Sequence, residues 1–303
     1  MNSIDKLISL ANVRGSLDLR CQFQGDWALE HEQEALGKAP YHVVLSGECR
    51  VELPSGQRLS MRAGDVLLLP GGAPHVLHSP GKAVAPTLVS AKRIDAGILP
   101  IHRIGGVSAD LDMLCGCFHF NRTSLLFASL PDYLLIPSGT LPADGPLQSL
   151  VDLLRGEADG DQIGAKFLLD ALSQALFTLI LRAHLSSHGQ DIGTLALLSD
   201  KRLGPVWQAM LADPAHEWTI QNLADIACMS RASFMRAFVR VAGVSPWVLL
   251  TQVRMELAFS LLSHSHLGLK DIALQVGYQS QAAFSKKFKE VYGAPPGRMR
   301  RRI

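Results

Sequence analysis

The stretch TIQNLADIACMSRASFMRAFVRVAGVSP, residues 219–246, carries a pattern that returns in LKDIALQVGYQSQAAFSKKFKEVYGAPPGR, residues 269–298. The triplet Asp225-Ile226-Ala227 recurs after 46 residues. Four later landmarks recur after 50 residues: Phe234, Phe238, Gly243 and Pro246. Matched landmarks whose spacing differs only across a turn predict a duplicated structural unit, with four extra residues in the central turn of the second copy.

Each copy is predicted to form a helix, a turn and a second helix. Phe234 and Phe238 are four residues apart, as are Phe284 and Phe288, so one face of each second helix is expected to lie in a core. The opposite faces carry the cations Arg236, Arg240, Lys286, Lys287 and Lys289. A single copy would fit a helical bundle with a solvated basic face equally well. Two copies favour helices that present their cations to DNA.

Residues 269–298 resemble the signature of the AraC/XylS transcription regulators. The similarity lies in Asp271-Ile272-Ala273, Val276-Gly277-Tyr278, Phe284, Phe288 and Gly293-Ala294-Pro295-Pro296. It covers roughly the last 100 residues of the chain. The resemblance implies two helix-turn-helix units joined by a long helix from about Pro246 to Ser263. It also implies a double-stranded DNA operator as the partner, read in two adjacent major-groove segments, and RNA polymerase as a second partner.

The side chains that read bases lie at the exposed start of the second helix in such units. Matching the family motif assigns this role to Arg231, Ala232, Met235 and Arg236 in the first unit, and to Gln281, Ala282, Ser285 and Lys286 in the second. Arg236 is expected to contact guanine and Gln281 adenine, each with two hydrogen bonds. Arg240, Lys287 and Lys289 are expected to contact phosphates and so to fix the register.

Charge is unevenly distributed along the 303 residues. From Ser199 onward there are 14 Lys and Arg against 7 Asp and Glu, whereas the preceding part has 15 against 20. A basic C-terminal domain beside an acidic N-terminal domain suits DNA binding by the former. No secretory signal or membrane span is expected. Five cysteines without framework spacing indicate a reducing, cytoplasmic setting.

The N-terminal part changes to short strands separated by Gly and Pro turns, which predicts a β-barrel or sandwich. The segment Gly64 to His75, with its spacing Gly-x5-Pro-x-Gly-x2-His, resembles the second conserved motif of the cupins. Residues 5–185 also resemble the sensor domain of cupin-type AraC regulators, through Tyr41-His42 and Cys115-Gly116-Cys117-Phe118. The fold class expected is therefore α+β and multidomain: an N-terminal cupin-like β-barrel with a helical appendage, then an all-α domain with two helix-turn-helix units.

The first cupin motif is only partly present. The histidines available to it are His31 and His42, far apart in sequence, and with His75 they could converge in a barrel to hold a metal ion. The plainer alternative is a turn residue at His75 and a half-buried strand residue at His42. No other cofactor is expected. A metal-dependent cupin oxygenase fused to a DNA-binding module is a third reading of the chain, which the broken motif argues against.

Two hypotheses describe the signal. The first is oxidation: Cys21 follows Arg20, and a nearby cation favours the reactive thiolate. Cys21 and Cys115, with Trp27, His42 and His75, resemble positions in a reactive-chlorine-responsive activator of the family, which implies a disulfide between Cys21 and Cys115 or Cys117. Free cysteines are also often simply buried, as expected for Cys49 and Cys228. The second hypothesis is a small-molecule effector in the barrel, walled by Trp27, Phe118 and Phe120.

Two helices are expected after the barrel, at about Pro146 to Arg155 and Ile163 to Leu185. The apolar face of the second is too wide for a lone surface helix, so we expect it to cover the barrel and to form a homodimer interface. The expected division of the chain is a sensor domain in residues 1–140, a helical dimerisation and coupling segment in residues 141–187, a linker in residues 188–199 and the DNA-binding domain in residues 200–303.

Overall fold

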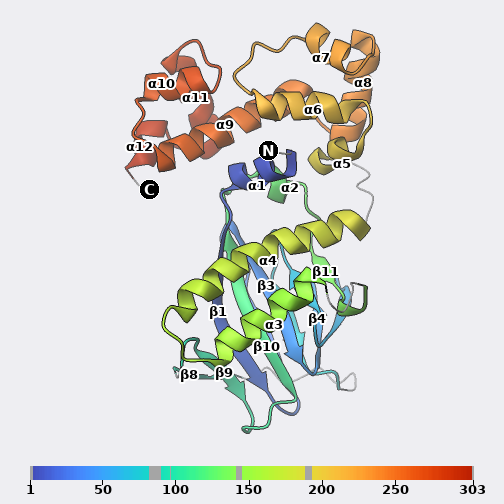
Figure 1. The fold of residues 1–303 in the computed structure, drawn as a ribbon, viewed down its shortest axis with the longest axis vertical. Helices are drawn as coiled ribbons and strands as arrows, with labels where there is room; N and C mark the ends of the chain where they lie inside the picture. The colour runs from blue at the N-terminus through green and yellow to red at the C-terminus, as the bar shows by residue number, and fades with distance from the viewer. Residues whose placement is uncertain (1–2, 82–89, 96, 141–144, 188–192, 302–303) are drawn as a thin grey trace. The chain divides into compact units, whose positions relative to one another are not determined.

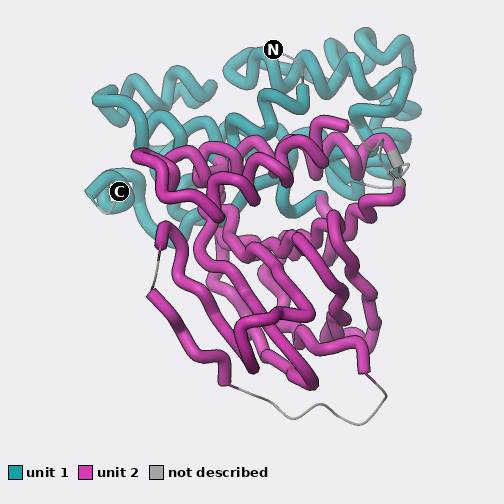
Figure 2. The backbone as a smooth tube through the Cα atoms, turned by 60° about the horizontal axis from the view of Figure 1, so that its bottom comes forward, with its two compact units in different colours: residues 1–12, 121–129, 189–303 teal, residues 13–120, 130–188 magenta. Residues whose placement is uncertain are grey.

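The structure, a computed structural model, describes residues 3–81, 90–95, 97–140, 145–187 and 193–301. The chain forms two compact units (Figure 2). The β unit comprises residues 13–120 and 130–188, and the helical unit comprises residues 1–12, 121–129 and 189–303. Each unit is described by itself below.

Two sheets make the β unit (Figure 1). The seven-stranded sheet has the order β11-β6-β3-β10-β1-β9-β8, and the four-stranded sheet has the order β2-β7-β4-β5. The strands are β1 (Arg14–Phe23), β2 (Ala28–His31), β3 (Lys38–Ser46), β4 (Glu48–Glu52), β5 (Arg58–Arg62), β6 (Val66–Leu68), β7 (His75–His78), β8 (Lys92–Ile94), β9 (Ile101–Ile104), β10 (Leu111–His119) and β11 (Leu134–Ile136). The short strands predicted for the N-terminal part are confirmed.

The core of the β unit lies between the sheets. Side chains of the larger sheet, such as Val44 and Met113, meet side chains of the smaller one, such as Val51 and Leu77, in one buried cluster. The short strands β4 and β5 alternate buried and more exposed residues, as expected where one face of a strand lies on a core. The strand-rich, cupin-like half predicted from the sequence is thus confirmed.

Helices α3 (Pro146–Asp159) and α4 (Ala165–Ser187) lie across the outer face of the larger sheet (Figure 1). The hydroxyl of Tyr41 in β3 lies 2.7 Å from the Ser173 hydroxyl in α4 and donates to the Ser16 carbonyl, 3.0 Å away. Gly116 permits this approach, because a Cβ there would lie 2.4 Å from the Tyr41 hydroxyl. By length and hydropathy α4 could cross a membrane, but 44% of that stretch is buried in the protein, where α4 packs against β1 and α3.

The helical unit contains α1 (Ser3–Ala11), α2 (Leu125–Ala128), α5 (Thr194–Ser199), α6 (Leu203–Ala212), α7 (Ile220–Ile226), α8 (Arg231–Ala242), α9 (Pro246–His264), α10 (Leu269–Gln275), α11 (Gln281–Tyr292) and α12 (Pro296–Arg300), while the 3₁₀ turn Ser138–Thr140 follows β11 in the β unit. The two helix-turn-helix units and the long helix between them, α9, are confirmed. Ser230 and Ser280 cap α8 and α11, and Gly243 and Gly293 end these helices in the left-handed conformation.

The predicted alignment of the two copies is wrong in its first half. Helices α7 and α10 have equal length, and their buried pairs are Leu223-Ala224 and Ile272-Ala273, which are 49 residues apart. The second turn is therefore one residue longer than the first, not four. The triplet starting at Asp225 matched by coincidence, because in α7 it stands at the helix end, where Ile226 is exposed.

The division into domains also differs from the one expected. Helix α5 falls inside the predicted linker, yet Leu195 and Leu197 are buried in the helical unit. Two segments of the predicted sensor domain belong to the helical unit as well: α1 contacts α6 and α9, and α2 contacts α5. Residues 188–192 of the predicted linker and 141–144 of the coupling segment lie outside the described residues.

Candidate functional site

Two thiols and three imidazoles converge in the interior of the β unit. His42 in β3 is the cross-strand partner of Cys115 in β10, and the His42 Nδ1 atom lies 3.1 Å from the Cys115 sulfur. Cys21 in β1 lies on the other side, with 3.7 Å between the two sulfur atoms. From the smaller sheet, β7 brings His75 Nε2 to 2.9 Å from His42 Nε2. We call these residues, with His31, the thiol–histidine cluster.

The hydrogen bonds of the cluster define the tautomers of its histidines. His75 Nδ1 lies 3.0 Å from the carbonyl oxygen of Ala73, which can only accept, so His75 carries its proton on Nδ1. His75 Nε2 is then the acceptor, and His42 must donate to it from Nε2. The remaining nitrogen of His42, Nδ1, is left as an acceptor for the Cys115 thiol. A directed chain of hydrogen bonds thus runs from Cys115 to Ala73.

His31 completes the group of histidines. It pairs with His75 in the β2–β7 ladder, and the two rings stack with centroids 4.5 Å apart. One ring nitrogen from each of His31, His42 and His75 lies within 4.8 Å of the others. The Nδ1 atom of His31 is buried without a hydrogen-bond partner, an arrangement that a bound cation would relieve. The three predicted metal ligands therefore converge, and their chemistry fits a transition-metal ion.

Burial keeps the cluster neutral. Burial, and next the charge of His75, lowers the pKa of His31 to about 4. Burial and the neighbouring histidines lower the pKa of His42 well below its usual range, and burial lowers that of His75. The hydrogen bond with Cys21, together with burial, raises the pKa of Cys115 well above its usual value. At neutral pH the imidazoles therefore offer lone pairs and Cys115 holds its proton.

The expected influence of Arg20 on Cys21 is wrong. Successive residues of a strand point to opposite faces, so the Arg20 side chain leaves the sheet on the side away from the Cys21 sulfur. Arg20 instead binds two carboxylates, those of Asp112 and Asp159. Among the described contacts of Cys21, the polar neighbour is the Cys115 thiol.

The other cysteines lie apart from this pair. Cys117 is two residues further along β10, its sulfur faces the Phe118 carbonyl oxygen, and burial raises its pKa to about 11. Cys49 is buried in the core as predicted, which raises its pKa to about 12. Cys228 was expected to be buried in a helix, and this is wrong: it is exposed in the turn after α7, with φ at +52°.

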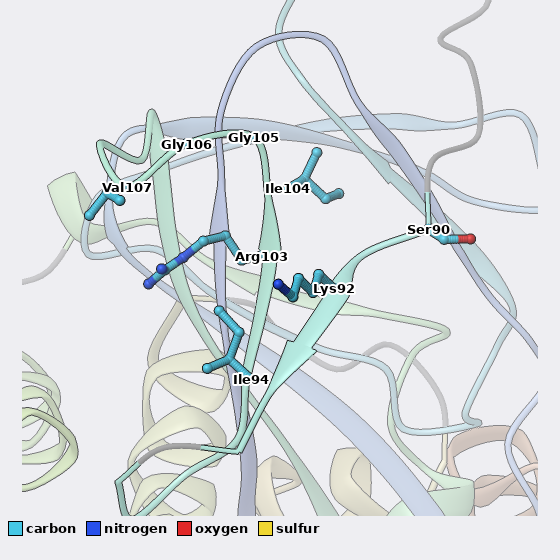
Figure 3. Close-up of a pocket in the computed structure, with 8 residues that line it drawn as sticks. All are labelled: Ser90, Lys92, Ile94, Arg103, Ile104, Gly105, Gly106 and Val107. Carbon is cyan, nitrogen blue, oxygen red and sulfur yellow. The ribbon is translucent and has the colours of Figure 1, made fainter.

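A hollow lies at the edge of the larger sheet, beside β8 and β9 (Figure 3). Lys92 and Arg103 line it together with Ile94 and the loop that ends at Val107. None of the aromatic walls expected for an effector pocket lines this hollow. Trp27 packs on Phe23 in the core, and Phe118 packs between Tyr41 and Phe177.

The residues expected to read DNA occupy equivalent places on α8 and α11. Arg231, Ala232 and Arg236 are exposed at the start of α8, as Gln281, Ala282 and Lys286 are on α11, whereas Met235 and Ser285 are half-buried. Phe234 and Phe238, like Phe284 and Phe288, are fully buried on the opposite face. Two of the cations have partners within the protein: Arg231 binds the Gln221 side chain, and Lys287 pairs with Glu290 at 2.5 Å. Arg240 and Lys289 are exposed near the helix ends.

Comparison with known proteins assigns both halves of the chain. Profiles of two protein families match it, one described as "Cupin" over residues 3–186 and one described as "Helix-turn-helix domain" over residues 223–302. An uncharacterised HTH-type transcriptional regulator of Haemophilus influenzae is 39% identical over all of this chain and 99% of its own length. The RCS-specific HTH-type transcriptional activator RclR of Escherichia coli is 30% identical over all of this chain and 98% of its own length.

The chain belongs to the AraC/XylS family of transcription regulators. A further relative, the HTH-type transcriptional regulator MtrA of Neisseria gonorrhoeae, is 30% identical over 99% of this chain and 98% of its own length. This AraC/XylS protein is therefore a DNA-binding regulator and not an enzyme, and the reading as a cupin oxygenase is set aside.

The structure of this AraC/XylS regulator adds polar contacts that the sequence did not single out. Within the helical unit, Glu256 of α9 is buried and its Oε1 atom accepts from the backbone N–H of Leu125, 2.6 Å away. Asn121 donates to the Tyr292 hydroxyl at 3.0 Å, and Arg122 binds the Tyr292 carbonyl. Glu256 lies on the buried face of α9, and its partner Leu125 is 131 residues away in the sequence, so no local motif reveals the contact.

Proposed function

We propose that this regulator is a thiol switch in which oxidation joins Cys21 to Cys115. The observation that carries the proposal is the 3.7 Å between their sulfur atoms, across neighbouring strands of one sheet. A disulfide bond is about 2.05 Å long, so the sulfurs must approach by less than 2 Å. Cys117, which has no described sulfur contact with Cys21, is the less suitable partner.

His42 is proposed to act as the base in the oxidation of Cys115. A two-electron oxidant such as hypochlorous acid would convert the Cys115 thiol to a sulfenyl chloride, and His42 Nδ1 would pass the thiol proton to the departing hydroxide, which leaves as water. The Cys21 sulfur would then attack the Cys115 sulfur and displace chloride, which forms the disulfide and releases one proton. The two thiols lose two electrons in total, and the oxidant is reduced to chloride and water. The relative RclR is named an RCS-specific activator, and its 30% identity to this chain supports this class of signal.

Chain connectivity offers a route from the thiols to the DNA-binding helices. Strand β1, which carries Cys21, begins three residues after α1, and β10, which carries Cys115, is followed directly by the segment from Asn121 to Ser129. Both α1 and this segment belong to the helical unit. A disulfide between the two strands would therefore restrain the two segments together, and would shift an equilibrium between states with different DNA affinity.

For the output we propose that the starts of α8 and α11 read the operator, with Arg236 and Gln281 as base contacts and Arg240, Lys287 and Lys289 as phosphate contacts. The exposure of Arg236, Gln281, Arg240 and Lys289 fits these roles, whereas Lys287 is half-buried and would have to exchange Glu290 for a phosphate. Activation through RNA polymerase and a cytoplasmic location follow from this function. A small-molecule effector is the alternative signal, for which the hollow beside Lys92 and Arg103 is the site to screen.

A homodimer is also proposed. Phe167 and Leu168 at the start of α4, Ile163 in the turn before it and Leu153 of α3 are apolar and exposed, and Phe167 exposes 83% of its surface. Monomers rarely expose several large apolar residues together. A second copy, meeting this patch through its own, would cover it by a two-fold symmetric contact.

Operator-dependent transcription with purified full-length protein tests the switch. Wild type, Cys21→Ser and Cys115→Ser are compared before and after one equivalent of hypochlorous acid, with Cys49→Ser and Cys117→Ser as controls. We expect the two first variants to lose the response while both controls keep it. A full response to the oxidant in Cys21→Ser would refute the switch. Loss of the response in all four variants, controls included, would show that the loss is not specific to Cys21 and Cys115.

A further inference from the structure

We propose that His31, His42 and His75 hold one divalent transition-metal ion, and that the affinity of this site depends on the oxidation state of Cys21 and Cys115. The first half stands on the histidines alone. The second half rests on the thiol switch proposed above, and its measurement is separate.

The geometry of the histidines is close to that of a metal site. Imidazole nitrogens bind zinc at 2.0–2.1 Å in tetrahedral sites, so two such ligands lie about 3.3 Å apart, and the pair here would need to open by only a few tenths of an ångström. The His42 and His75 Nε2 atoms are 2.9 Å apart, and His31 brings the third nitrogen within 4.8 Å. These ligands come from both sheets, because β3 carries His42 whereas β2 and β7 carry the other two. No other group of His, Cys, Asp or Glu with metal-ligand spacing occurs among the residues that the structure describes.

The outer partners of the ligands suit a metal. The Nδ1 atom of His75 donates to Ala73, which orients the ring and leaves Nε2 free to coordinate, an arrangement common among metal-binding histidines. His31 has a buried ring nitrogen without a partner. Three nitrogen ligands and no carboxylate favour zinc, copper, nickel or ferrous iron over magnesium or calcium, which prefer oxygen. Three protein ligands also leave a coordination position for water.

Metal binding would reverse the hydrogen bond between His42 and Cys115. In the hydrogen-bond chain described above, His42 donates from Nε2 to His75 and accepts from Cys115 at Nδ1. A metal on Nε2 displaces that proton, and a neutral imidazole must then carry it on Nδ1. His42 would therefore donate to the Cys115 sulfur. Cys115 becomes the outer partner of a metal ligand, and the state of its sulfur becomes part of the metal site.

Disulfide formation would weaken this outer contact. The Cys115 sulfur would move toward Cys21, away from His42, and a disulfide sulfur is a poor acceptor. Loss of an outer partner typically lowers metal affinity by 10- to 100-fold, and we expect about tenfold here. By linkage, the metal must then favour the reduced thiols by the same factor, and tenfold corresponds to about 30 mV in the reduction potential of the pair.

Metal binding is tested on reduced, chelator-treated full-length protein by calorimetry with Zn²⁺ and by absorbance with Co²⁺. We expect about one ion per chain and, with Co²⁺, visible bands of a low-symmetry nitrogen site. His31→Gln and His75→Gln should weaken binding at least tenfold. The control is His78→Gln, three residues from His75 in β7, where the ring faces away from the cluster. Equal binding by all three variants, or no binding by wild type, would overturn the site.

The dependence on oxidation is tested by the same titration on the Cys21–Cys115 disulfide form and on Cys115→Ala, with Cys117→Ala as the control. We expect both to bind Zn²⁺ about tenfold more weakly than the reduced wild type, and Cys117→Ala to match wild type. Unchanged affinity in Cys115→Ala would refute the coupling while leaving the metal site in place. If no disulfide can be formed, the thiol switch fails, and the titrations of the histidine variants still decide the metal site.

Discussion

Cys228 and Gly277 occupy the same position in the two helix-turn-helix units, and both adopt the left-handed conformation, with φ at +52° and +79°. Each is the second residue after its first helix. The match fixes the true alignment of the duplication and places the extra residue of the second copy after Gly277. The same left-handed backbone position is thus occupied by a cysteine in the first unit and by a glycine, which has no side chain to strain it, in the second.

A side chain in the left-handed conformation costs about 1–2 kcal/mol, which Cys228→Gly would relieve. Ordering a glycine on folding costs more chain entropy and offsets part of this gain. Cys228→Gly is therefore expected to leave the stability unchanged or to raise it by up to about 1 kcal/mol. Gly277→Ala is expected to destabilise by about 2 kcal/mol or more, because its Cβ would lie 2.8 Å from the Arg254 guanidinium carbon. Urea unfolding of both variants checks the pair. Equal losses would contradict the shared position.

Glu256 makes the helical unit sensitive to pH. Burial raises the pKa of Glu256 to about 8, and only the hydrogen bond from Leu125 opposes this. Tyr292 is a titratable neighbour in the same unit. The folded state thus retains a proton that the unfolded chain loses near pH 4.5, so stability falls as pH rises from there to about 8, by up to about 1.4 kcal/mol per pH unit.

Glu256→Gln should remove this dependence, because the amide keeps an acceptor for Leu125 and cannot ionise. Hydrogen exchange of residues 121–129, corrected for the intrinsic pH effect, gives the readout. We expect protection to decline between pH 6 and pH 8.5 in wild type and in the exposed control Glu48→Gln, and to stay constant in Glu256→Gln. The same decline in all three proteins would exclude Glu256 as the cause.

DNA binding separates the roles proposed for Arg236 and Lys289. Arg236→Ala is expected to relax specificity at one base pair by roughly 1–3 kcal/mol. Lys289→Ala should weaken binding to every sequence alike and reduce the salt dependence by about one phosphate contact. Fluorescence anisotropy on a panel of operator variants at fixed salt measures both. A uniform loss in Arg236→Ala would make it a phosphate contact.

The self-association proposed for α3 and α4 is tested by Phe167→Asp. A carboxylate in the centre of the exposed apolar patch should convert a dimer to a monomer in sedimentation experiments, since a buried unpaired charge is costly. Leu36→Asp is the matched control, because Leu36 is equally exposed but lies in the turn before β3. Dimers in both variants would place the contact elsewhere.

Local patterns in the sequence predicted the helical unit well. The glycines that end α8 and α11 and the buried phenylalanines four residues apart are local signals, and they depend on neighbours within one or two helical turns. The alignment at Asp225 was wrong because it relied on the identity of three residues. The correct match follows from which residues of α7 and α10 are buried, and the sequence does not show burial directly.

Long-range pairing could not be predicted in the same way. His31 and His75 become partners through the β2–β7 ladder, and Cys115 meets His42 through β10–β3. Strand order and register follow from the whole sheet, not from either residue's neighbours. The motif that ends at His75 identified a cupin-like turn. Only the pairing of the strands revealed which other histidines and which cysteine lie next to His75. The same holds for Leu125 and Glu256, which lie 131 residues apart.

Peptide mass spectrometry of the thiols is the measurement that tests the central claim most directly. Full-length protein is treated with one equivalent of hypochlorous acid, remaining thiols are blocked, and disulfide-linked peptides are identified before and after reduction. The account predicts one dominant, reversible link between Cys21 and Cys115, with Cys49 and Cys117 still alkylated. Unlinked Cys21 and Cys115 in oxidised protein, or a link from Cys21 to Cys117 in place of Cys115, would contradict it.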